Sequence, residues 1–179
     1  MTDSATTPEP IKGEAGNKPP PPPTTAVVTQ VTVAAAAPRD VKISDLEVSI
    51  SSIRPGSVPP LTVSEGSDEG ISIVLHFGQD QPRQSVTAIV VTVISKMPVP
   101  VSDFELRAVV PKGCKVKLQA PSAREMPAHN PFVPPSAITQ VMLIANPLDI
   151  QPVSFKYVLS YLVDGEPQTE MGEVDRLPI

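Results

Sequence analysis

Cys114 is the residue whose surroundings come nearest to those of a catalytic nucleophile. The stretch PKGCKVKLQAPS (111–122) places three lysines around it: Lys112, Lys115 and Lys117. Nearby cations lower the pKa of a thiol and raise its thiolate fraction. A nucleophile of this kind also needs a base, and no motif connects Cys114 with either histidine, His76 or His129. We therefore expect Cys114 to pack as a small hydrophobic residue, and we expect no enzymatic activity.

The sequence lacks the residue spacings that metal sites and nucleotide sites need. One cysteine and two isolated histidines form neither the CxxC nor the HxxxH spacing of a tetrahedral zinc site. The nine glycines form neither a GxGxxG nor a GxxxxGK[ST] phosphate loop. The acidic residues near the C-terminus lack the alternation of an EF-hand and are expected to form a solvated rim: Asp164, Glu166, Glu170, Glu173 and Asp175. The sequence therefore predicts no metal and no cofactor.

Charge and composition narrow the range of partners and the compartment. A net charge of -5 and an isoelectric point near 5.0 disfavour nucleic acid as a partner. A single cysteine cannot form an internal disulfide, and the start MTDSATTPEP lacks the features of a secretory signal. The apolar run 86–95 is about half as long as the roughly 20 residues of a membrane-spanning helix. We expect a cytoplasmic protein that does not insert into membranes.

The composition changes near residue 44. Residues 1–44 contain eight prolines, including Pro19–Pro23, and no aromatic residue, whereas all six Phe and Tyr residues lie between Phe77 and Tyr161. Such a segment buries too little apolar surface to offset its chain entropy. It is predicted to be a disordered Pro-rich arm, and its PPPPP run to be a spacer rather than a ligand for a polyproline-binding domain.

From Asp45 onward the hydrophobic period is two, which is typical of half-buried strands. Turn-forming segments separate the candidate strands, which are 46–50, 71–77, 86–95, 104–110, 115–119, 138–145 and 153–163. No stretch between them is suited to a crossover helix, which excludes a parallel sheet. The pattern predicts one all-β domain over 45–179, an antiparallel sandwich of about eight short strands.

Positive charge is concentrated beside Cys114. Residues 104–124 hold five basic residues and one acidic residue. Within KVKLQ, Lys115 and Lys117 share one face of the predicted strand, and Val116 and Leu118 share the other. From the pattern alone, two readings stay open. The lysines either face an acidic partner or protect an edge strand from aggregation.

Several ordered motifs connect the folded part with a known family. The longest is VPKGCKVKLQAPSAREMPAHNPFVPPSAITQVMLIANP (110–147), and the others are SIRPGSVPPLTV (52–63), ISIVLHF (71–77) and EMGEVDRLP (170–178). Together these segments resemble the gamma-adaptin ear domain, and in particular the ear of the GGA proteins, the Golgi-localised, gamma-ear-containing, ARF-binding adaptors. The resemblance covers residues 45–179.

The resemblance implies an immunoglobulin-like β-sandwich with a non-catalytic function. Ears of this family bind short peptides of accessory proteins, in which bulky hydrophobic residues surround a small or acidic one. We therefore expect a monomeric clathrin-adaptor module, peripherally associated with the trans-Golgi network and endosomes and in indirect contact with the clathrin coat. The alternative that remains is a structural β-sandwich that associates through an edge strand.

The resemblance also implies a peptide-binding site. Its shallow hydrophobic pockets fall on Val109, Leu118 and Pro121, and two of its basic residues on Lys112 and Lys156. We expect Lys115 and Lys117 of the basic strip to complete the rim. The sequence departs from the family at Ser154 and Val158, where relatives often have basic residues. The resemblance therefore implies a less cationic rim.

Overall fold

The computed structural model describes residues 40–64 and 70–179. These residues form one short 3-10 helix and eight strands: η1 (Ile50–Ser52), β1 (Leu61–Ser64), β2 (Ile71–Phe77), β3 (Val86–Ser95), β4 (Val101–Val109), β5 (Lys115–Leu118), β6 (Ala137–Ala145), β7 (Phe155–Val163) and β8 (Glu166–Val174). The predicted all-β fold is confirmed. Residues 40–64 and 70–179 include no helix with the length and apolar character of a membrane span.

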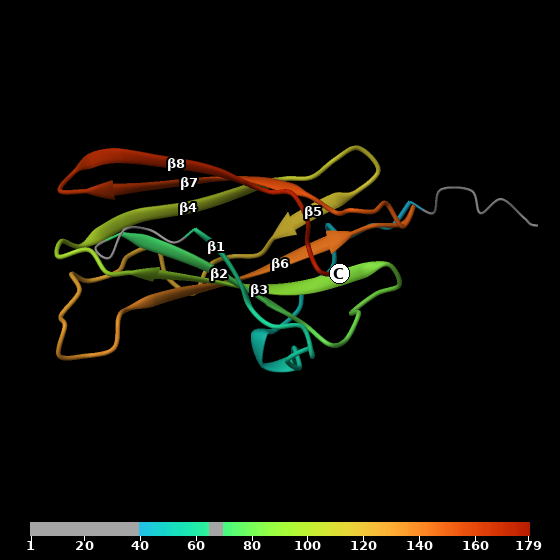
Figure 1. Ribbon diagram of the computed structural model, residues 1–179, viewed down its shortest axis with the longest axis horizontal. Helices are drawn as coiled ribbons and strands as arrows, with labels where there is room; N and C mark the ends of the chain where they lie inside the picture. The colour runs from blue at the N-terminus through green and yellow to red at the C-terminus, as the bar shows by residue number, and fades with distance from the viewer. Residues whose placement is uncertain (1–39, 65–69) are drawn as a thin grey trace, which may run out of the picture. The chain divides into compact units, whose positions relative to one another are not determined.

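The strands form two antiparallel sheets that pack as two layers (Figure 1). One sheet has five strands in the order β1-β2-β3-β6-β5, and the other has three in the order β4-β7-β8. Strands β4 and β5 follow each other in the chain but belong to different sheets, and each lies at an edge of its own sheet. The predicted antiparallel sandwich is therefore confirmed, and the edge strands β4 and β5 meet on one side of the molecule.

The main core lies between the sheets and follows the alternation of the strands. In β2, Ile71, Ile73 and Leu75 are buried while His76 is exposed. Strand β7 contributes every second side chain, three of them aromatic, to the same core: Phe155, Tyr157, Leu159 and Tyr161. A Cβ atom at position 172 would lie 2.4 Å from the hydroxyl of Tyr157, so Gly172 provides the space that this ring occupies.

Strand β6 is buried on both faces. Ile138, Met142 and Ile144 face the main core. The opposite face belongs to a second hydrophobic cluster: Ile43, Val86, Ala88, Val141, Leu143 and Ala145. Residues 40–53, which we call the N-terminal strap, cover this outer face and add Val41, Leu46, Val48 and Ile53 to the cluster. The five-stranded sheet thus has a second, smaller core on its outer side.

Residues 46–50 are not the strand that the sequence predicts. Leu46 and Val48 do pack inward on the second cluster, but helix η1 begins at Ile50, and none of these residues joins a sheet. The side chain of Gln119 takes the place of a neighbouring strand, because it accepts the backbone N–H of Val48 at 2.9 Å and donates to its carbonyl at 3.1 Å. The alternating pattern therefore reflects burial without a sheet.

The predicted disordered arm covers residues 1–44. Residues 1–39 of it lie outside the described residues, and only 40–44 are described. Ile43, on the arm side of the predicted boundary, is 5 % exposed. The prediction also missed two strands, β1 and β8. For β8 the sequence does contain a signal, because the pair Asp164-Gly165 is typical of a tight hairpin. In the structure both residues have positive φ (52° and 79°) in the turn between β7 and β8.

Candidate functional site

An open groove runs beside the edge strands β4 and β5, with a volume of about 690 Å³. The two strands are joined by a tight turn, in which the backbone N–H of Cys114 donates to the carbonyl of Pro111 at 3.1 Å. Gly113 adopts a φ of 95°, which favours glycine. Residues of both strands and of the turn between them line the groove: Ala108, Val109, Val110, Cys114, Lys115, Val116 and Lys117. The turn therefore brings predicted site residues of β4 and β5 to one groove, namely Val109, Lys115 and Lys117.

Val109 is the most prominent apolar residue of this region. Its side chain is 64 % exposed, although it lies in the middle of a hydrophobic segment. It borders the groove and also a smaller hollow of about 150 Å³, which Phe155, Lys156 and Glu173 line on the other side. An exposed valine between two hollows is a suitable contact for a hydrophobic ligand side chain.

Two of the predicted basic residues lie near Val109. Lys156 is its direct cross-strand partner on β7, and the Lys156 ammonium forms an ion pair with Glu173 on β8 at 3.1 Å. Lys112 is exposed in the turn between β4 and β5 and forms no hydrogen bond or ion pair with any residue in 40–64 or 70–179. The positive charge of Lys112 is therefore available to a ligand, whereas that of Lys156 is partly neutralised.

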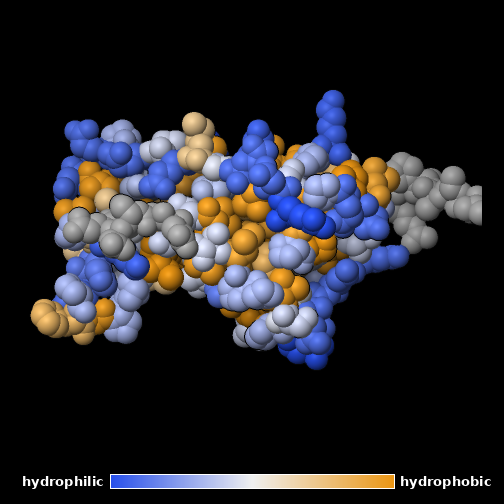
Figure 2. All heavy atoms as spheres, viewed as in Figure 1, coloured by the Kyte–Doolittle hydropathy of each residue, from blue (hydrophilic) through white to orange (hydrophobic). Residues whose placement is uncertain are grey.

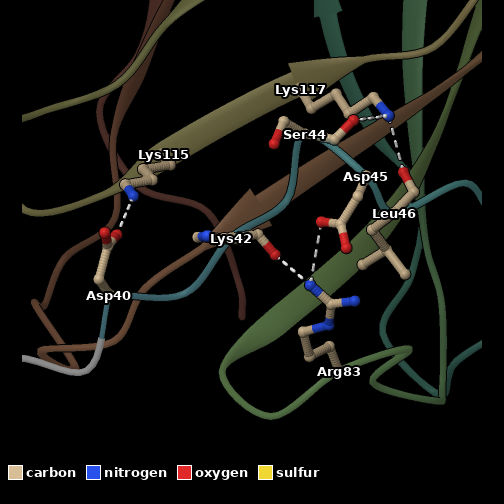
Figure 3. A network of polar contacts seen from close by, with 8 residues as sticks. All are labelled: Asp40, Lys42, Ser44, Asp45, Leu46, Arg83, Lys115 and Lys117. Carbon is tan, nitrogen blue, oxygen red and sulfur yellow. Dashed lines mark hydrogen bonds and ion pairs between the residues drawn. The ribbon is translucent and has the colours of Figure 1, made fainter.

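Lys115 and Lys117 hold the strap instead. Figure 3 shows both side chains directed from β5 toward residues 40–46. Lys115 forms an ion pair with Asp40, and its hydrogen bond and charge lower the pKa of that carboxyl group. The Lys117 ammonium donates to the carbonyl oxygens of Ser44 at 2.8 Å and Leu46 at 2.9 Å. The predicted basic strip is therefore divided, because the ammonium groups of Lys115 and Lys117 bind the strap and that of Lys112 does not.

Arg83 anchors the strap from the other side. Its guanidinium donates to the carbonyl of Lys42 and to the Asp45 carboxylate at 3.3 Å (Figure 3). The hydrogen bond from Arg83 lowers the pKa of Asp45. Together with the Gln119 side chain, these contacts tie the strap to β5 and to the segment before β3 at several points.

The two remaining predicted pocket residues are half-buried. Leu118 packs against the main core together with Val116, on the side of β5 opposite to the lysines. Pro121 follows β5 and is also partly exposed. Neither residue lines the groove or the smaller hollow. The structure therefore brings Val109 and Lys156 together and places Leu118 and Pro121 farther along the same edge.

The sequence-based prediction missed one wall of the groove. Lys42, Ile43 and Ser44 of the strap line it opposite β4. The signal for this wall is the alternation of Val41 and Ile43 ahead of Leu46, which extends the apolar pattern into the predicted arm. A third cation, Lys42, therefore borders the groove in addition to Lys115 and Lys117 of β5.

Cys114 is a buried thiol that contacts Asn146 Oδ1 at 3.6 Å. Burial raises its pKa, so the neutral form is favoured and nucleophilic reactivity is lowered. Lys115 and Lys117 do not reverse this effect because their ammonium groups are directed to the strap. Residues 40–64 and 70–179 contain no group of three His, Cys, Asp or Glu side chains that could hold a metal ion.

The sequence of residues 59–178 matches the adaptin C-terminal domain family. The chain belongs to this family. The adaptin C-terminal domain described here is 39% identical over 143 residues to the ADP-ribosylation factor-binding protein GGA1 of Homo sapiens, and 40% identical over 141 residues to the human protein GGA3. These alignments cover 79% and 78% of this chain but only 22% and 19% of the relatives. The chain thus spans about a fifth of the length of the curated relatives it matches.

Solved structures agree with this assignment at the level of the fold. The domain superposes on the GAE domain of GGA2p from Saccharomyces cerevisiae with a TM-score of 0.55 and 20% sequence identity. The match covers 68% of this chain and 99% of the yeast domain. The immunoglobulin-like appendage fold that the sequence motifs imply is therefore confirmed.

Replacement of Gln119 by leucine should loosen the strap while leaving the sandwich folded. The substitution removes both side-chain hydrogen bonds to Val48, worth together about 1 to 2 kcal/mol. We expect the Val48 amide to exchange with solvent about tenfold faster or more in native-state hydrogen exchange. Gln168→Leu on the exposed part of β8 is the matched control and should not change this rate. An unchanged rate in Gln119→Leu would show that these bonds do not hold the strap.

Proposed function

We propose that this adaptin C-terminal domain binds short peptides of accessory proteins through the groove beside β4 and β5. The observation that supports the proposal most is Val109, which is 64 % exposed and lines both the open groove and the smaller hollow. The relatives suggest the setting. As in GGA adaptors, the peptides would belong to proteins of clathrin-coated vesicle traffic at the trans-Golgi network and endosomes.

The backbone of β5 can bind part of the peptide. Among the described residues β5 pairs only with β6, so its other edge presents backbone N–H and C=O groups toward the groove. An extended peptide can add to such an edge as a further strand, with every second side chain directed toward the domain. Backbone hydrogen bonds then supply affinity that does not depend on the peptide sequence.

The side chains around the groove supply the selectivity. One buried Phe or Leu of the ligand contributes roughly 1.5 to 3 kcal/mol, and each exposed lysine contact about 0.2 to 1 kcal/mol. We assign the hydrophobic contacts to Val109, with Leu118 and Pro121 farther along the edge. Lys112 and Lys156 attract acidic residues of the peptide, and Lys115 and Lys117 contribute at longer range from β5, where their ammonium groups are bound to the strap.

These contributions correspond to a weak, reversible complex. After ordering costs we expect a dissociation constant of about 1 to 10 μM, near -7 to -8 kcal/mol. Such affinity suits a contact that is strengthened by multivalency when many copies assemble in a coat. We further propose that the domain itself is monomeric and contacts the clathrin coat only indirectly.

Replacement of Val109 or Lys112 by glutamate should weaken peptide binding. Val109→Glu removes the apolar contact and repels acidic ligands, and we expect about a tenfold loss of affinity or more. Lys112→Glu should cost about threefold to tenfold. The measurement is a fluorescence anisotropy titration with a labelled peptide in which two phenylalanines flank a glycine after several aspartates.

Val133→Glu is the matched control for these variants, because Val133 is 53 % exposed and lies in the distant loop before β6. It should bind the peptide as the unmodified chain does. Equal affinity of all four proteins would contradict the assigned groove. Light scattering on the same samples tests the structural alternative, since an edge-strand scaffold would self-associate and ignore the peptide.

Glu173→Gln should strengthen the binding of acidic peptides. The substitution removes the carboxylate that forms an ion pair with Lys156 at 3.1 Å and releases the ammonium for the ligand. Both side chains are largely exposed, so the gain should be about twofold to fivefold at low salt and smaller at high salt. A peptide whose aspartates are replaced by asparagine should show no gain. A weaker complex with the acidic peptide would argue against a role for Lys156.

A further inference from the structure

The loop between β5 and β6 carries an aromatic side chain that the groove does not use. Phe132 is 94 % exposed, more than any other large hydrophobic residue that the structure describes. Its neighbour Val133 is 53 % exposed. Figure 2 shows hydrophobic atoms at the outer tip of this loop, which Figure 1 draws in orange at the lower left. Nearly the whole ring therefore stands in water, without packing that would explain it.

The backbone holds this ring in a defined position. The Asn130 carbonyl accepts the N–H of Val133 at 3.1 Å, and its side-chain Oδ1 accepts the N–H of Phe132 at 3.0 Å. Pro131, between them, fixes its own φ near the value that such a turn needs. At the base of the loop, the His129 N–H donates to the carbonyl of Met97 at 2.7 Å. The turn is thus organised before any partner binds, which lowers the entropic cost of binding.

We infer that the Asn130–Val133 turn is a second binding element, which inserts Phe132 into an apolar pocket on a partner protein. Residues 127–137 contain no Asp, Glu, Lys or Arg, so the contact needs no complementary charge. The partner's pocket is small enough for one phenyl ring and has a polar rim. A polar atom on that rim accepts a hydrogen bond from Asn130 Nδ2, which has no hydrogen-bond partner within residues 40–64 and 70–179.

This element is separate from the peptide groove. The loop ends where β6 begins at Ala137, whereas Lys115 of the groove pairs with Ala145 at the other end of β6. Successive residues of a strand are about 3.3 Å apart, so the two positions are separated by roughly 26 Å. The domain can therefore receive one peptide in its groove while it offers its own turn to a different protein.

The probe for this inference is a purified domain that binds a synthetic peptide containing Asn-Pro-Phe, titrated with the intact chain in a calorimeter. We expect the chain to bind the probe and the Phe132→Ala variant to lose about tenfold to hundredfold in affinity. Asn130→Ala, which releases the turn, should lose about threefold to tenfold. Met171→Ala, which truncates another largely exposed hydrophobic side chain on β8, serves as the control and should bind like the unmodified chain.

Three results would overturn the inference. One is an intact chain that does not bind the probe, and another is a Phe132→Ala variant that binds equally well. The third is Phe132-dependent flotation with neutral phosphatidylcholine vesicles without binding to the probe, which would assign the ring to a lipid surface. Unchanged thermal unfolding of Phe132→Ala, expected from the exposure of the ring, shows that a lost signal is not caused by unfolding.

Discussion

The burial of β6 on both faces is the constraint on which the rest of this structure depends. A strand with apolar residues at consecutive positions, such as Val141 to Ala145, needs cover on two sides. The three-stranded sheet covers one side, and the strap covers the other. Because the strap lacks strand partners of its own, side chains of the neighbouring edge must anchor it, and Lys117 and Gln119 do so.

This anchoring divides the basic residues by function. Alternation on β5 directs Lys115 and Lys117 to the outer face, where the strap neutralises or binds them. Lys112 precedes the strand and forms no hydrogen bond or ion pair with the strap, so its charge remains available to a ligand. The strap also contributes Ile43 and Lys42 to the groove wall. Stability of the outer core and shape of the ligand groove are therefore coupled through one segment.

Much of the fold could be predicted from the sequence, because the period-two pattern reports the burial of one strand face directly. It identified β2, β3, β6 and β7 closely, yet it failed at residues 46–50, where the same pattern arises without a sheet. The partners of Lys117 lie about seventy positions away in the sequence, and no local pattern indicates such a contact. The positions of Val109 and Lys112 came from a family resemblance, which carries no information about the strap.

An NMR titration with the acidic, phenylalanine-containing peptide tests the central claim most directly. If the groove binds the peptide and the strap lysines are structural, the largest amide shift changes will occur at Val109 to Lys112, along β5 and at Lys156. The strap amides of Leu46 and Val48 will keep both their shifts and their slow exchange. Shift changes concentrated on Leu46 and Val48, with Val109 and Lys156 unaffected, would contradict this division of roles.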